Sequence, residues 1–464
     1  MLLAPLAEVA ERLRTRRLSP VELTAAVLAR IERLDPALRA FVTVTPERAL
    51  AAAREAESAI ASGRWRGPLH GVPVSLKDLF DVRGVRTSAG SRFLAEHVAQ
   101  DDSAVAARLE AAGAVLVGKA NLHEFAYGTT CDSTIAGAIR NPWKRDAIPG
   151  GSSGGSGAAV AAGLGFASIG TDTGGSVRIP AACCGVVGLK PTFGRISRHG
   201  LVPLAPSLDH VGPLTRTVHD AALVFAALAG HDPRDPDSLA APVPDLAQAA
   251  GRGVRGLRLG ILDTTLESAS SEVAAAVGVA AERLRGAGAE LRRVSLATLE
   301  SVRHAAFVML FAESLATHRA RFESEPERFF PDVRARFERA LPLSAVDYVA
   351  ALEARRAGAA EALRALAEVD ALVTPTLPTG AAPCGATQVA VDERAVDVAV
   401  ANTLYTREWN VLGFPALSVP CGFTGDGLPI GMQLVARPCD EATLVRAGAE
   451  YQRLTDWHAR APAL

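Results

Sequence analysis

The chain carries five glycines and three serines within ten residues, Ile148-Pro149-Gly150-Gly151-Ser152-Ser153-Gly154-Gly155-Ser156-Gly157. Glycine serves where the backbone takes a positive φ or is approached closely, and a serine hydroxyl can donate, accept or attack. A flexible Gly/Ser linker is the alternative interpretation. However, the run 158–162 predicts a helix, 166–169 predicts a buried strand, and a second glycine-rich turn follows at 170–176. We therefore interpret the two glycine-rich segments as turns that face one site.

Strands and helices alternate on both sides of these turns, which is typical of α/β proteins. Upstream, two N-terminal helices are expected, the first beginning at Ser19-Pro20 and ending at Asp35-Pro36, because a residue before proline disfavours the helix. The patterns then predict strands over 71–80, 115–118, 257–262, 371–374, 416–422 and 430–435, and helices over 46–62, 105–113, 217–229, 271–286, most of 302–368, and from 441. Helical structure is also expected to begin behind Ser176, and 375–397 is expected to be irregular.

No repeat and no Pro/Ser-rich linker divides the 464 residues, which favours one continuous domain. Within it we expect four segments: an N-terminal helical layer over 1–66, a catalytic core over 67–220, a helical insertion and cover over 221–400, and a C-terminal return to the sheet over 401–464.

Composition excludes several classes of protein. Hydrophobic residues make up 49% and charged residues 21% of the chain, as in globular proteins, and a net charge of −1 gives no reason to bind nucleic acid or an anionic membrane. Neither a signal peptide nor a membrane span is predicted. The six cysteines show no framework spacing, so we expect a reducing, cytoplasmic location.

The motifs of nucleotide and metal chemistry are missing. A phosphate-binding loop would need a lysine where Ala158 follows Gly157, no dinucleotide fingerprint is present, and no metal-ligand spacing occurs, so we expect no cofactor and no metal. Nucleophilic catalysis fits better, but His199 and His210 come without a G-x-S-x-G elbow. Lys77 is the other candidate base, because burial on an apolar strand can leave a lysine neutral. A solvent-facing or Asp78-paired Lys77 is the alternative.

Three co-linear motifs resemble the amidase signature family: G-V-P-V-S-L-K-D at 71–78, G-G-S-S-G-G-S at 150–156 and T-D-T-G-G-S-V-R-I-P at 171–180. The likeness is dense over about 70–220 and resumes weakly at 413–420. It implies a single α/β domain of the amidase-signature type. In this fold a central mixed β-sheet of many strands is covered by helices on both faces, as an α/β/α sandwich.

The resemblance also implies a Ser–cis-Ser–Lys triad that works through an acyl-enzyme. Ser176 matches the family's nucleophile, Ser152 its bridging serine and Lys77 its base. Ser152 would pass the proton of Ser176 to neutral Lys77. The family holds the bridging serine by a cis peptide bond, here Gly151–Ser152. Ser153 is the alternative bridging residue.

Further positions around this triad follow from the same resemblance. An oxyanion hole is expected from the backbone N–H groups of Thr173, Gly174, Gly175 and Ser176. Substrate contacts are expected at Ala126, Tyr127, Gly128 and Ser153. Asp172 and Arg178 are expected to support the nucleophile loop.

The family contains stand-alone amidases, carbamate hydrolases and the glutamine-hydrolysing subunit of tRNA amidotransferases. The core resembles this last subunit closely, but Arg334-Ala335-Arg336-Phe337 and Arg407-Glu408-Trp409-Asn410 depart from its expected pattern. Trp409 and Phe414 suggest an apolar or aryl substrate, although a core tryptophan is an equal alternative. We therefore expect a stand-alone hydrolase of small or aryl amides, with carbamates and esters left open. The amidotransferase subunit and a non-catalytic binding relative are the alternatives.

The expected partners follow from that choice. They are a small-molecule amide or carbamate substrate, with no nucleic acid directly involved and no membrane. Oligomeric state is left open, and a homodimer is compatible with the sequence.

Overall fold

The computed structural model describes residues 1–464, which form a single α/β domain around one mixed sheet of 11 strands. The strand order is β1-β3-β2-β4-β6-β5-β12-β13-β9-β7-β8. The strands are β1 (Phe41–Val44), β2 (Pro73–Lys77), β3 (Val115–Ala120), β4 (Ala167–Asp172), β5 (Val187–Lys190), β6 (His210–Thr215), β7 (Arg258–Leu262), β8 (Glu290–Val294), β9 (Ala371–Pro375), β12 (Ala416–Phe423) and β13 (Pro429–Val435). β2 runs parallel to both β3 and β4, whereas β6, β5, β12 and β13 pair antiparallel.

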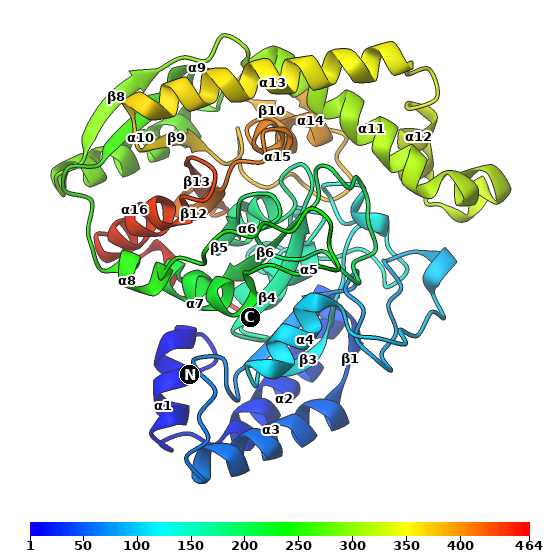
Figure 1. The fold of residues 1–464 in the computed structure, drawn as a ribbon, viewed down its shortest axis with the longest axis vertical. Helices are drawn as coiled ribbons and strands as arrows, with labels where there is room; N and C mark the ends of the chain where they lie inside the picture. Colours follow the sequence, from blue (N-terminus) through cyan, green and yellow to red (C-terminus); the bar gives the residue numbers. More distant parts are fainter.

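Helices surround the sheet (Figure 1). Those of the N-terminal half are α1 (Leu6–Arg14), α2 (Pro20–Leu38), α3 (Pro46–Ala61), α4 (Ala104–Ala111), α5 (Gly154–Ala161), α6 (Arg178–Cys184), α7 (Val218–Leu228) and α8 (Leu246–Ala250). Those of the C-terminal half are α9 (Asp263–Glu267), α10 (Ser271–Gly286), α11 (Leu299–Ser324), α12 (Pro331–Glu338), α13 (Ala345–Glu368), α14 (Val398–Thr403), α15 (Arg407–Val411) and α16 (Glu441–Arg453). No helix combines the length and the apolar character that crossing a membrane requires.

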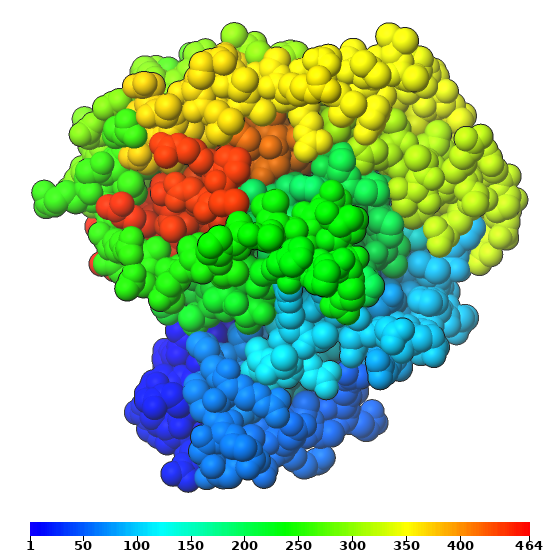
Figure 2. All heavy atoms as spheres, in the orientation of Figure 1, coloured from blue at the N-terminus to red at the C-terminus, as the bar shows by residue number.

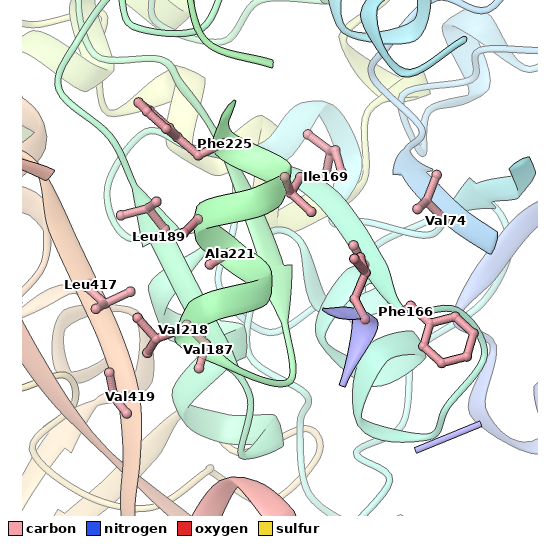
Figure 3. Close-up of a cluster of buried hydrophobic side chains, with 14 of the residues drawn as sticks. Val74, Phe166, Ile169, Val187, Leu189, Val218, Ala221, Phe225, Leu417 and Val419 are labelled. Carbon is pink, nitrogen blue, oxygen red and sulfur yellow. The ribbon is translucent and has the colours of Figure 1, made fainter. Parts of the chain in front are cut away.

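Strand β5 shows how both faces of the sheet are covered. Val187 and Leu189 belong to the apolar cluster in which Val218 and Phe225 of α7 also lie (Figure 3). Gly188, between them, faces α6: a Cβ built there would lie 2.7 Å from the Ala181 Cβ. Successive strand residues point to opposite faces, so α6 and α7 pack on opposite sides of the sheet. The expected sandwich is confirmed.

A smaller apolar cluster packs the covering helices α11, α12 and α13 against the core. α11, α12 and α13 contribute Met309, Phe337 and Ala351 to a cluster that also contains Phe125 and Tyr127. Figure 2 shows this yellow-green part of the surface against the light-blue part that precedes the glycine-rich stretch. The cover therefore packs on one edge of the core.

Several elements differ from the sequence predictions. α2 continues through Pro36 and ends at Leu38, where the left-handed conformation of the next residue, Arg39, closes the helix. The Asp35 carboxylate accepts the Ala40 N–H at 2.7 Å. The segment 221–400 was expected to be a helical insertion and cover, but besides the predicted strands β7 and β9 it also supplies β8, which was not predicted, to the sheet. Residues expected to be irregular include the hairpin of β10 (Gln388–Val391) and β11 (Arg394–Asp397).

Candidate active site

Lys77 ends β2, and its side chain is fully buried. Its Nζ atom makes three hydrogen bonds, to Ser152 Oγ at 2.8 Å, Ser153 Oγ at 2.9 Å and Thr171 Oγ1 at 2.8 Å. All three partners are neutral hydroxyls. The structure thus brings Lys77 to the glycine-rich stretch, 75 positions further along the chain.

Burial sets the charge of this lysine. Desolvation lowers the pKa of Lys77 to about 7, against the weaker coulombic effects of Cys131, Asp172 and Asp209, which raise it. Removing an ammonium from water favours its neutral form, and no carboxylate contacts the Nζ atom to reverse this effect. A large fraction of Lys77 is therefore a free amine near neutral pH.

The two serines differ in what else they bind. Ser153 Oγ donates to the Thr171 carbonyl at 3.1 Å and accepts the Thr171 N–H at 3.3 Å. A neutral amine has one lone pair and needs one hydroxyl to donate to it. The proton of Ser153 already points to a carbonyl, whereas Ser152 Oγ has no hydrogen-bond partner other than Lys77. The Gly151–Ser152 peptide bond is cis.

Ser176 follows β4 in the second glycine-rich turn. The preceding Gly175 has a φ of +133°, and a Cβ there would lie 2.3 Å from Thr406 Oγ1, so only glycine fits. Ser176 is 6% exposed, and its hydroxyl makes no hydrogen bond within the chain. Its carbonyl accepts the Ser153 N–H at 3.3 Å, which places the two glycine-rich turns side by side.

The expected oxyanion donors fall into two groups. The Gly175 N–H donates to Asp172 Oδ1 at 2.8 Å, so this N–H is already occupied and the expectation for Gly175 needs correction. The N–H groups of Thr173, Gly174 and Ser176 make no hydrogen bond within the chain. Three donors therefore remain available at the turn.

Asp172 and Arg178 hold this turn from beneath. Arg178 contacts Asp172 in two hydrogen bonds of 2.8 and 3.0 Å, and both side chains are fully buried. Burial alone raises the pKa of Asp172, but the charge and hydrogen bonds of Arg178, together with Lys190 and Asn410, lower that pKa below its usual range. The pair is completed by Asn410, which donates to Asp172 at 2.8 Å, and by Gln433, which accepts from Arg178 at 2.7 Å.

A pocket of about 110 Å³ opens beside Ser176. The expected positions Ala126, Tyr127 and Gly128 line it together with Thr173 and Gly174. Ser153 does not: it lies below the wall, on Lys77. The aromatic and cationic part of the wall was not predicted from the sequence. It comes from α11, α12 and α15 and the segments beside them, and it includes Phe307, Phe311, Arg336, Arg339 and Arg407.

The predicted aryl-binding residues lie elsewhere. Trp409 and Phe414 belong to a buried cluster with Leu366 and Leu372, between the sheet and α13. Neither residue lines the pocket. The core alternative is the correct one for Trp409, and these two residues give no support to an aryl substrate.

The surroundings of His210 and Cys131 make them unsuited to act as a catalytic base or nucleophile. His210 Nδ1 lies 2.6 Å from the Leu208 carbonyl, and burial lowers the pKa of His210 well below its usual value. Cys131 adjoins the glycine-rich stretch, but burial raises the pKa of its thiol to about 12, so it is not a thiolate. No cluster of side chains suited to holding a metal ion is present.

Comparison with known proteins agrees with this geometry. A sequence model described as amidase matches residues 22–445. The chain belongs to the amidase family. The resemblance seen in the three motifs therefore extends over nearly the whole chain.

Relatives within the amidase family share the full length of the chain. It is 44% identical over 473 residues to a glutamyl-tRNA(Gln) amidotransferase subunit of Chloroflexus aggregans, covering 96% of this chain and 95% of the relative. The structure of the subunit of the same name from Thermotoga maritima has a TM-score of 0.78 at 34% identity, covering 92% of this chain and 90% of that one. A chain from a vestigial protein complex, described as revealing the evolutionary origins of an s-triazine catabolic enzyme, has a TM-score of 0.93 at 37% identity, covering 97% and 98%.

These relatives contradict the expected partners. Several curated relatives at 41–44% identity are named as a subunit, and the enzyme they belong to is named for a tRNA. The expectation of a stand-alone hydrolase with no nucleic acid directly involved is therefore wrong. It rested on two short segments that depart from the pattern of amidotransferase subunits, while the chain as a whole matches such subunits over its full length.

Proposed function

We propose that this chain is the glutamine-hydrolysing subunit of a glutamyl-tRNA(Gln) amidotransferase, which cleaves the side-chain amide of glutamine to release ammonia. The observation that carries the chemistry is Lys77, a buried lysine of lowered pKa hydrogen-bonded to Ser152 beneath the pocket that Ser176 lines. Full-length identity to subunits of that enzyme supports the choice of substrate over other amides.

In the acylation step, Ser176 Oγ attacks the carbonyl carbon of the amide. Its proton passes to Ser152, and the Ser152 proton passes to the lone pair of neutral Lys77. The C–N bond then breaks, and the relay runs in reverse to protonate the leaving nitrogen. Ammonia departs, and the acyl group remains as an ester on Ser176.

Deacylation uses the same groups on water. Lys77, again neutral, takes a proton from water through Ser152, and the hydroxide attacks the ester carbonyl. The tetrahedral intermediate collapses, the Ser176 oxygen is reprotonated, and glutamate leaves. Each cycle consumes one water and returns every side chain to its starting state.

The N–H groups of Thr173, Gly174 and Ser176 stabilise the negative oxygen in both steps. Each donor to such an oxygen is worth about 3–4 kcal/mol in comparable sites. Asp172 keeps the turn that presents them in place, because its carboxylate accepts the N–H groups of Gly175 and Val177 at 2.8 and 3.1 Å. Ser153, we propose, orients Lys77 and does not touch the substrate.

The test is ammonia release from L-glutamine by the chain alone and by the chain assembled with the other amidotransferase subunits and glutamyl-tRNA(Gln). We expect release by the assembly, loss of that release in Ser176→Ala, and transfer of the ammonia to the tRNA-bound glutamate. An assembly that leaves glutamine intact, or a chain that binds none of the other subunits, would contradict the proposal.

A further inference from the structure

Arg407 is a buried cation without a partner. It begins α15 and is 6% exposed, yet its side chain makes no hydrogen bond and no ion pair. Its Nε and Nη1 atoms are out of contact with solvent and have no acceptor. Buried donors without acceptors cost free energy, and a buried charge without a counter-ion costs more. A bound anionic ligand would remove this cost by accepting from the unpaired donors.

Arg407 lines the pocket, so a ligand bound there could supply the missing acceptor. Its guanidinium lies over the ring of Phe307 at 3.9 Å, and both residues line the pocket with Ser176. A Cβ built on Gly174 would lie 3.9 Å from the Arg407 Cβ, so the side chain starts next to the nucleophile turn. Because the ring stacks on the face of the guanidinium, an acceptor would have to approach it at its edge.

The other charges nearby are already paired or exposed. Arg336 on the same pocket wall bonds to Asp332 at 2.5 Å, and Arg339 is exposed. Glu408, adjacent in sequence, points to Arg303 at 3.4 Å. Asp397 caps α14 by accepting the N–H groups of Ala399 and Val400. The Oε2 atom of Glu408 is buried without a hydrogen-bond partner, but neither it nor any other carboxylate of the chain lies within ion-pair distance of the Arg407 guanidinium.

We infer that Arg407 binds a carboxylate of the substrate, so that the amide this site cleaves belongs to a small molecule that also carries a carboxylate. A guanidinium presents parallel N–H donors that match the two oxygens of a carboxylate. The inference deepens the proposed function on which it rests, since glutamine is one member of this class. It adds a specificity-determining residue in a segment that departs from the pattern expected of amidotransferase subunits.

The experiment compares L-glutamine with 4-aminobutanamide, which is glutamine without its carboxylate. The assembled protein is used as wild type, Arg407→Met and Arg407→Lys, with Arg319→Met on the exposed face of α11 as the matched control. We expect Arg407→Met to lower kcat/KM for glutamine by about 100-fold or more, chiefly through KM, and to change it by less than about threefold for 4-aminobutanamide. Arg407→Lys should recover part of the loss. Equal losses on both amides would mean a structural role, and an unchanged glutamine rate would also overturn the inference.

Two further measurements separate this inference from the proposed function. Calorimetry on Ser176→Ala should show glutamine binding that Arg407→Met abolishes, without any need for turnover. If wild type does not cleave glutamine, succinamate and propanamide form the second pair. Arg407-dependent preference for succinamate would then support the inference while the glutaminase proposal fails. Preference for propanamide, or indifference to Arg407→Met, would overturn the inference itself.

Discussion

At the scale of single residues, the site depends on keeping one amine uncharged. Lys77 is surrounded by three hydroxyls, so the lowering of its pKa by burial is not reversed by any carboxylate in contact. A base must be deprotonated before it can accept a proton. In the proposed mechanism, the charge state of Lys77 therefore controls how much of the enzyme is active at a given pH.

This predicts the pH profile. Because the pKa of Lys77 is lowered to about 7, the amine is protonated and inactive below that pH and free above it. The value of kcat/KM should therefore rise about tenfold per pH unit at acidic pH and level off above an inflection near pH 7. Lys77→Met should lose about a thousandfold or more at pH 8. A profile that falls with rising pH, or a modest loss in Lys77→Met, would point to another base.

The two serines on Lys77 give a second prediction. Ser152→Ala removes the proton bridge and should lower kcat by a factor of about 1,000 or more, while KM changes little. Ser153→Ala removes one of three contacts that orient the amine, so its loss should be nearer tenfold. Single-turnover rates with both variants check this order. The reverse order would make Ser153 the bridge.

At the scale of elements, the nucleophile turn is rigid because a buried ion pair supports it. Asp172 at the end of β4 binds Arg178 at the start of α6, and this pair also bonds to residues of α15 and β13. The turn between them carries Ser176. Loss of the pair should therefore affect both stability and catalysis.

Replacing Asp172 by asparagine tests this support. Arg178 would keep its buried charge and lose its counter-ion, which costs about 3–5 kcal/mol in comparable pairs. Urea unfolding at pH 7 should show that loss, whereas Glu353→Gln, which breaks the exposed Arg356 pair, should change stability by less than about 1 kcal/mol. Equal effects from the two substitutions would mean that the Asp172 pair contributes no more than an exposed one.

Elements with strong local patterns were predictable from the sequence, and those defined by long-range contacts were not. The helix at 271–286 and the strands β12 and β13 follow their apolar spacing. β8 has the sequence Glu-Leu-Arg-Arg-Val at the edge of the sheet, where polar side chains face solvent and no apolar alternation occurs. β6 contains Gly212-Pro213, which indicates a turn locally but lies between β4 and β5 in the sheet.

The candidate site divides in the same way. Lys77, Ser152 and Ser176 lie in motifs that are recognisable over a few residues, and the structure brings the segments that carry them together. Asn410 and Arg407 have no local signature. Asn410 acts through Asp172, 238 positions away, and Arg407 reaches the pocket only because α15 packs beside the nucleophile turn. The residues proposed to react thus lie in short motifs that the sequence alone reveals, whereas the residues proposed to support the turn or bind the substrate do not.

At the scale of the whole molecule, the fold joins a core that holds the reacting groups to a cover that shapes the pocket. Lys77 and Ser176 come from neighbouring strands of one sheet and the turn that follows, while Arg336 and Phe307 come from the helices of the cover. Full-length identity of 41–44% to curated subunits covers both parts. We therefore assign one reaction to the whole chain and expect the chain to act within an assembly.

In the proposed mechanism, glutamine is hydrolysed through an ester on Ser176, and trapping that ester is the most direct test. The assembled protein is mixed with L-glutamine, quenched in acid within one turnover, and digested for mass spectrometry. We expect one glutamyl group on the peptide that contains Ser176 and none in Ser176→Ala. A glutamyl group on Cys131, or turnover with no adduct on either residue, would contradict the mechanism.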